Sequence, residues 1–236
     1  MTIEEFRHEV LFHYLDRDLL VALDRDPSEW STGNGLLHLG LFMVVLYRQG
    51  ILDGSTAAIF DKAVNQCYVK DLLKQPILGL LNRNPGRTDM ESRDDYIGVA
   101  AASALLCTRH APDIRKYGEQ NGFNYNNQDP GKFTWNSWHG RFLGLPGFYA
   151  MCAGKNPGIV QNMALKLKLF FYPKEFQGEI LMWVMTQVLK RLTPQYDGLI
   201  NRFEKHLTQK YPNLGSLFLP YFGESHPFSK LEIRIK

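Results

Sequence analysis

The sequence has few cysteines, and they carry no metal-binding pattern. Cys67, Cys107 and Cys152 are far apart, and none forms a CxxC motif or a Cys/His pair with zinc spacing. Each lies in an apolar context, where a free cysteine behaves as a small hydrophobic residue. The cysteines therefore favour a reducing compartment over a disulfide framework.

The sequence also lacks a long apolar run. The longest, GLLHLGLFMVVLY, contains His38 and is shorter than the ~20 residues that a membrane-spanning helix needs. The opening stretch MTIEEFRHEV is acidic and polar, unlike a secretion signal. We therefore expect a soluble, cytoplasmic protein with no membrane partner.

Common cofactor motifs are missing as well. The sequence has no GxxxxGK[ST], GxGxxG, HExxH or GxSxG, and its histidines show no ligand spacing. We expect no cofactor and no metal site, although the acidic loop before residue 96 leaves calcium open, because oxygen ligands have weak signatures. The net charge is only +3 and the basic residues are scattered, which disfavours nucleic acid as a partner.

Helical periodicity dominates what is present. Apolar residues recur every three or four positions from Phe6 to Leu20, and the segments 36–47 and 94–107 are apolar on nearly every face, as in buried helices. Further helices are expected at 55–69, 158–171, 175–192 and 194–210, and only LEIRI near residue 235 resembles a strand. The pattern predicts one all-α domain over residues 1–236.

Three polar loops each precede a buried helix. They are WSTGNG before Leu36, ESRDD before Tyr96 and TWNSWHGR before Phe142. Buried helices that alternate with half-exposed ones are typical of an α-hairpin array, in which inner helices are covered by outer ones. The three loops are then expected to converge at one end of the inner helices.

The acidic loop has two interpretations. Asp94 and Asp95 lie in the first turn of a predicted helix, where carboxylates cap the helix and interact favourably with its dipole. Alternatively, one of them works with Glu91 as a catalytic carboxylate pair, as glycoside hydrolysis requires. Adjacent residues point to different sides of a helix, so at most one of the two aspartates faces a pocket squarely.

The loop WNSWHGRF adds aromatic and cationic candidates. Trp135 and Trp138 can stack on a sugar ring or cover the end of the helices. His139 is a candidate general base, or a histidine bonded to a backbone carbonyl. Arg141 can bind an anionic substrate group or pair with an aspartate, which would lower the pKa of that aspartate.

The first polar loop contributes two substrate-binding candidates. Trp30 is a further stacking residue, and Asn34 can contact a ligand or orient a water molecule. As a plain structural alternative, Asn34 is the N-cap of the helix that follows.

These residues together resemble a known architecture. Trp30 and Asn34, the segment SRDDYIG at 92–98, and the group Trp135, Trp138, His139 and Arg141 resemble the (α/α) toroid folds of glycan-processing enzymes. The likeness covers roughly residues 31–192, and the chain is short for a full toroid, so it implies a partial one. The segments GNGLL, RNPGR and SRDDYIG are also similar to phage-encoded helical proteins, which would place the protein in a virion.

The resemblance implies a carbohydrate-active protein, a glycoside hydrolase or lyase acting on a polysaccharide or oligosaccharide. The alternative is a non-catalytic scaffold or virion assembly protein, with the apolar C-terminal stretch LGSLFLPYFGESHPF contacting a protein partner. Fold analogy alone does not decide between them.

Overall fold

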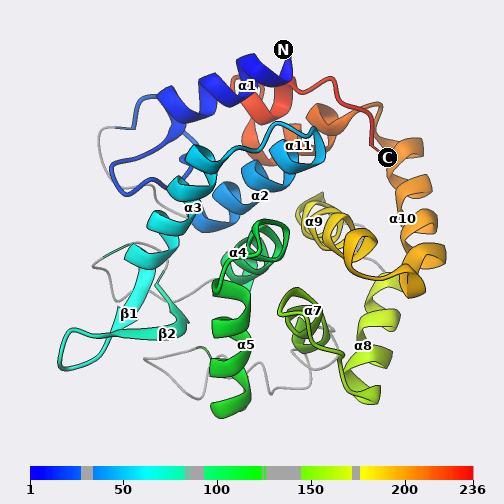
Figure 1. Ribbon diagram of the computed structural model, residues 1–236. Coiled ribbons are helices and arrows are strands. Elements are labelled where there is room, and N and C mark those ends of the chain that lie inside the picture. The colour runs from blue at the N-terminus through cyan, green and yellow to red at the C-terminus, as the bar shows by residue number, and fades with distance from the viewer. Residues whose placement is uncertain are drawn as a thin grey trace.

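The computed structural model describes residues 1–27, 34–82, 85, 93–123, 125, 145–171 and 176–235. Helices make up most of this part of the chain, which confirms the all-α prediction (Figure 1). Within these ranges, no helix is both long enough and apolar enough to cross a bilayer. The helical elements are α1 (Ile3–Glu9), the π-helical turn η1 (Val10–Tyr14), α2 (Gly35–Arg48), α3 (Gly54–Cys67), α4 (Arg93–Leu106), α5 (His110–Gln120), α7 (Leu145–Cys152), α8 (Ile159–Phe170), α9 (Phe176–Leu192), η2 (Pro194–Tyr196), α10 (Asp197–Lys210), α11 (Leu214–Phe222) and η3 (Pro227–Lys230).

Buried and half-exposed helices alternate along the chain, as the sequence predicts. Most side chains of α2, α4, α7 and α9 that the structure describes are buried, whereas α3, α5, α8 and α10 bury only one side. Figure 1 shows α3 and α5 on one side and α8 and α10 on the other, with α4, α7 and α9 between them. The alternation gives each inner helix an outer neighbour. Its closure into a toroid stays a prediction.

The two innermost helices, α2 and α4, cross at a pair of glycines. A Cβ added at Gly40 would lie 2.4 Å from the carbonyl oxygen of Gly98, and one added at Gly98 would lie 2.7 Å from Cα of Leu37. No side chain fits at such distances, so the backbones touch directly. Glycine at these two positions therefore allows the close packing of α2 against α4.

A short antiparallel hairpin interrupts the helices, and the sequence did not predict it. β1 (Tyr68–Lys70) pairs with β2 (Pro76–Leu81), and the structure shows no strand at LEIRI. The hairpin lies against α5, where a Cβ at Gly79 would approach the carbonyl oxygen of Asp113 to 2.2 Å. The run PILGLL does not alternate clearly between apolar and polar residues, so the usual strand signal is missing.

Several local predictions need correction. The apolar stripe from residue 6 does not continue as one helix to Leu20, because the carboxylate of Asp16 accepts the backbone N–H groups of Asp18 and Leu20 and closes a loop. Residues 110–120, which are not among the helices expected from the sequence, form α5. Helix α3 begins one residue earlier than predicted, with Asp53 as its N-cap.

The apolar C-terminal stretch lies in the core. Leu214, Leu217, Phe218, Phe222 and Phe228 are all buried. The ring centroids of Phe6 and Phe228 are 5.1 Å apart, so the first and last turns share one hydrophobic cluster. These side chains are therefore covered by the protein itself, whereas Leu219 in the same stretch is 39% exposed, and contact of the stretch with a protein partner stays a prediction.

Candidate functional site

One polar cluster lies at the N-terminal end of α2. The side-chain amide of Asn34, the residue before the helix, donates to the hydroxyl of Tyr221 on α11 at 2.9 Å. That hydroxyl lies 3.2 Å from Nε2 of His38, whose Nδ1 is 3.1 Å from the carbonyl oxygen of Val21. Since a carbonyl only accepts, Nδ1 carries the proton, and the hydroxyl of Tyr221 donates to Nε2.

Burial makes His38 a poor proton acceptor. Its side chain is enclosed, and desolvation lowers its pKa to about 3. A general base works best when its pKa is near the working pH. The His38 imidazole therefore stays neutral near pH 7 and holds the cluster together instead of exchanging protons.

A second buried histidine lies beside this cluster. Nε2 of His226 is 3.1 Å from the carbonyl oxygen of Ala22, and Nδ1 of His226 accepts the backbone N–H of Phe228. The ring of Phe222 contacts both histidines, with centroids 4.9 Å from His38 and 4.5 Å from His226. Burial lowers the pKa of His226 to about 4. His38 on α2 and His226 in the C-terminal region thus bind the backbone carbonyls of two consecutive residues, Val21 and Ala22.

The aspartates of the acidic loop point into the protein. Asp95 is only 1% exposed, and its Oδ1 accepts the backbone N–H of Leu37 in the first turn of α2 at 2.9 Å. Asp94 is also buried, at 5% exposure. The carboxylate of Asp95 therefore caps a neighbouring helix, where the helix dipole stabilises a negative charge. Asp95 therefore caps α2, although it belongs to α4.

Part of the predicted site is thus brought together. Asn34 lies directly before α2, and Asp95 accepts a backbone N–H from the first turn of the same helix, so both lie at one end of α2, as expected if the inner-helix starts converge. His38 and Tyr221 are cluster members that the sequence did not reveal. His38 could have been noticed as the one polar residue within an apolar run, but Tyr221 is 187 residues from Asn34 and has no local signal. The remaining predicted residues lie outside the described part of the chain: Trp30, Glu91, Trp135, Trp138, His139 and Arg141.

A buried carboxylate on α9 forms a separate network. Glu179 accepts hydrogen bonds from Nε2 of His206 at 2.8 Å, from Nζ of Lys210 at 2.8 Å and from the hydroxyl of Tyr211 at 2.7 Å. Burial raises the pKa of Glu179, but these three donors together lower it below its ordinary value. The carboxylate is therefore ionised and bonded on both oxygens, which fastens α10 to α9 and leaves no proton to transfer.

A third network joins β1 to α3 and α5. The hydroxyl of Tyr68 lies 2.8 Å from Nδ1 of His110, and Nε2 of His110 lies 2.9 Å from a carboxylate oxygen of Asp61. The order Tyr–His–Asp resembles a nucleophile, its base and an orienting acid. Tyr68 is buried, however, and burial raises its pKa far above the usual value. A nucleophile must reach its substrate, so this chain of hydrogen bonds is structural.

Within the described ranges, no group of three or more His, Cys, Asp or Glu side chains is placed to hold a metal ion.

The surface of α8 carries an unusual concentration of exposed apolar side chains. Ile159 is 81% exposed, and the other large apolar residues on this surface are also in contact with solvent. We call this set the α8 face: Ile159, Val160, Met163, Leu167, Phe170 and Phe171. Leu165 and Leu169 of the same helix are fully buried, so α8 is apolar on two sides.

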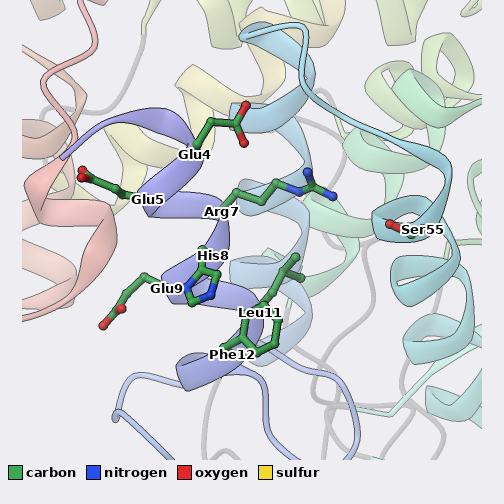
Figure 2. A pocket seen from close by; sticks show the side chains of 8 residues that line it. All are labelled: Glu4, Glu5, Arg7, His8, Glu9, Leu11, Phe12 and Ser55. Carbon is green, nitrogen blue, oxygen red and sulfur yellow. The ribbon is translucent and has the colours of Figure 1, made fainter.

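A pocket of about 760 Å³ opens between α1 and the start of α3 (Figure 2). Leu11 and Phe12 supply its apolar surface, and the rings of His8 and Phe12 stack with centroids 4.4 Å apart. Figure 2 shows Ser55 of α3 across from these side chains, and Glu4 and Glu5 nearer the start of α1. We refer to this hollow as the α1 pocket. It is apolar inside and acidic at its edge.

Comparison with known proteins gives no relative from which a role could be transferred: no protein-family model, curated protein or solved structure matches the chain significantly.

Proposed function

We propose that the protein is a non-catalytic assembly or scaffolding protein that docks on a partner through the α8 face. The observation that carries this proposal is the apolar surface on the outer side of α8. Contiguous apolar patches are uncommon on proteins that make no contacts, and they often mark interaction surfaces. The phage resemblance is compatible with a place in a virion.

The helical geometry makes the α8 face continuous. Positions 159, 163, 167 and 170 follow one another at three- or four-residue spacing, so their side chains align along one side of the helix. The buried residues Leu165 and Leu169 lie on the opposite side. An outer helix needs only one apolar side to pack on its own core, and the second side is the signature of a helix that binds a partner.

The state of the aspartates favours a non-catalytic role. A general acid or nucleophile must lie within hydrogen-bonding reach of the substrate. Asp95 is enclosed and accepts the N–H of Leu37, and Asp94 is nearly as buried. Asp95 thus supports the start of α2, and Asp94 lies in the first turn of α4, which agrees with the plainer of the two interpretations of the acidic loop.

A site-specific photo-crosslinker tests the docking surface. Placed at Met163, it should give discrete crosslinked species in expressing cells, because Met163 is exposed within the α8 face. The matched control places the same group at Lys116, an exposed position on the outer helix α5. Crosslinking at Met163 no stronger than at Lys116 would remove the proposal.

A carbohydrate-active enzyme remains the second candidate. It is supported by the convergence of Asn34, Tyr221 and Asp95 at the start of α2, since inner-helix N-termini carry the active sites in the toroid enzymes that the sequence resembles. The alternation of buried and half-exposed helices supports a partial (α/α) toroid. In this candidate, Glu91 and His139 supply the acid and the base, and Trp30, Trp135, Trp138 and Arg141 bind the sugar chain.

A panel of glycans separates the two candidates. The enzyme predicts release of reducing or unsaturated ends from at least one glycan, with at least about tenfold less release for Glu91→Gln or His139→Ala. The scaffold predicts no release from any glycan, while Asp95→Asn changes only thermal stability.

A further inference from the structure

The tip of the β1–β2 hairpin presents two leucines to solvent. Leu72 is 102% exposed and Leu73 is 79% exposed, far more than any role in the core would allow. The hairpin projects away from the helices at the lower left of Figure 1. We call this projection, residues 70–74, the hairpin tip. Two large apolar side chains at the end of a projection have no structural use within the protein itself.

The hairpin tip is held in a fixed shape. Oδ1 of Asp71 accepts the backbone N–H groups of Leu73 and Gln75, each at 2.8 Å, and the backbone N–H of Asp71 donates to the carbonyl of Gln75 at 2.9 Å. These bonds turn the carboxylate of Asp71 toward its own backbone. Lys70 and Lys74 are exposed on either side of the leucines. The tip is therefore an apolar projection whose backbone shape is fixed before binding, and a lysine lies on either side of its two leucines.

The α1 pocket has the complementary character. Its volume of about 760 Å³ is ample for two leucine side chains, and Leu11 and the 70% exposed Phe12 give it an apolar interior. Glu4 and Glu5 are exposed at its edge. Arg7 adds little opposing charge, since its guanidinium is paired with Asp53. The pocket thus offers apolar contact at Leu11 and Phe12, with negative charge toward the start of α1.

We propose that the hairpin tip of one copy of the protein inserts into the α1 pocket of a second copy. Leu72 and Leu73 then contact Leu11 and Phe12, while Lys70 and Lys74 face Glu4 and Glu5. The second copy is the occupant that the observations favour, because one chain carries both complementary halves. Opposite charges around an apolar centre speed association and fix the register.

This contact is of the head-to-tail kind. The hairpin tip and α1 lie on separate parts of the molecule in Figure 1, so one copy can use both surfaces at once with two different neighbours. Such contacts build rings or open chains. The proposal rests on the assembly role given above but uses no residue of α8, so either can fail without the other.

Two variants test the hairpin tip and the α1 pocket separately. Leu72→Asp with Leu73→Asp disables the tip, and Phe12→Asp disables the pocket; all three side chains are exposed, so folding should be preserved. The contact is small and therefore weak, so light scattering should extend to about 1 mM protein. The wild type should grow beyond a dimer with concentration, whereas each variant alone should associate at least about tenfold more weakly.

Mixing the two variants provides the decisive measurement. The tip-disabled copy keeps its pocket and the pocket-disabled copy keeps its tip, so a mixture should form a one-to-one dimer and stop there. Phe171→Asp, which alters the exposed α8 face, is the matched control and should assemble like the wild type. Glu4→Lys should weaken assembly, and Lys74→Glu on the same chain should restore part of it.

Three outcomes would overturn the proposal. The first is a wild type that stays monomeric throughout the concentration range. The second is assembly that survives in both variants or disappears in Phe171→Asp, which would assign self-association to another surface. The third is a monomer that binds anionic vesicles through Leu72 and Leu73, which would assign the hairpin tip to a lipid surface.

Discussion

The carboxylate of Asp95 on α4 caps α2 by accepting the backbone N–H of Leu37 at 2.9 Å. The first-turn N–H groups of a helix have no partner within the helix, and here a neighbouring helix supplies one. The same two helices touch at Gly40 and Gly98, about one turn further along. The starts of α2 and α4 are thus fixed to each other by a hydrogen bond and by direct backbone contact.

Removal of the Asp95 carboxylate should destabilise the protein. Asp95→Ala leaves a buried N–H at Leu37 without its acceptor, so the free energy of unfolding should fall by about 2 kcal/mol. Asp95→Asn keeps an oxygen acceptor and should lose less, about 1 kcal/mol. Urea denaturation measures both. Asp197→Asn, at an exposed first-turn acid of α10, is the control and should change stability by less than about 0.5 kcal/mol.

The close contact between α2 and α4 predicts that alanine has opposite effects on stability at two glycines. Gly98→Ala forces a Cβ to within 2.7 Å of Leu37 Cα, so it should destabilise the protein by at least about 2 kcal/mol. Gly198→Ala on α10 has no atom within 4 Å of its new Cβ and should stabilise the protein by about 0.5–1 kcal/mol. Equal effects at the two positions in denaturant unfolding would contradict the close approach of α2 and α4.

The buried histidines predict that stability falls with acidity. Burial lowers the pKa of His38 to about 3 and of His226 to about 4, from the ordinary value of 6.5. Below pH 6.5 the unfolded chain therefore binds protons that the folded protein does not, and each histidine costs about 1.4 kcal/mol per pH unit until its folded pKa is reached. Urea unfolding between pH 7 and pH 5 measures this loss. His226→Gln should remove about half of the slope, and a stability that is flat over this range would show that the two rings are not held neutral.

The contact between Asn34 and Tyr221 should show as coupling between the two side chains. Tyr221→Phe removes the hydroxyl that joins Asn34 to His38, and Asn34→Ala removes its donor. A double-mutant cycle should give a coupling free energy of about 1 kcal/mol. Additive losses would mean that the two side chains do not interact in solution.

Sequence patterns predicted the helices better than the contacts between them. The apolar runs around Leu41 and Ala101 identified buried helices, since helical periodicity and small residues are local signals. The hairpin was missed because Pro76–Leu81 reads as an uninterrupted apolar run, which does not distinguish a strand from a helix. The helix α5 was missed because its composition is polar, and its amphipathic pattern is short.

The candidate site could be predicted only in part, and for a physical reason. Helix capping was one of two interpretations of Asp95 from its position, and a sequence does not show that the capped helix is a different one. Tyr221 and His226 reach the site through tertiary packing from the last third of the chain, and no periodicity reports such contacts. The burial of the C-terminal stretch could not be predicted either, because apolar residues in a broken helix fit a core and an exposed interface equally well.

The shared core of the first and last turns has a consequence for how the protein is made. His226 binds the carbonyl of Ala22 across 204 residues, and Phe6 packs on Phe228. During synthesis the contact between Phe6 and Phe228 can therefore form only after residue 228 has left the ribosome, whereas Phe42 can cover another side of Phe6 much earlier. Contacts between residues so far apart in sequence slow folding, so closure of this cluster is expected to be a late step in the folding of the protein.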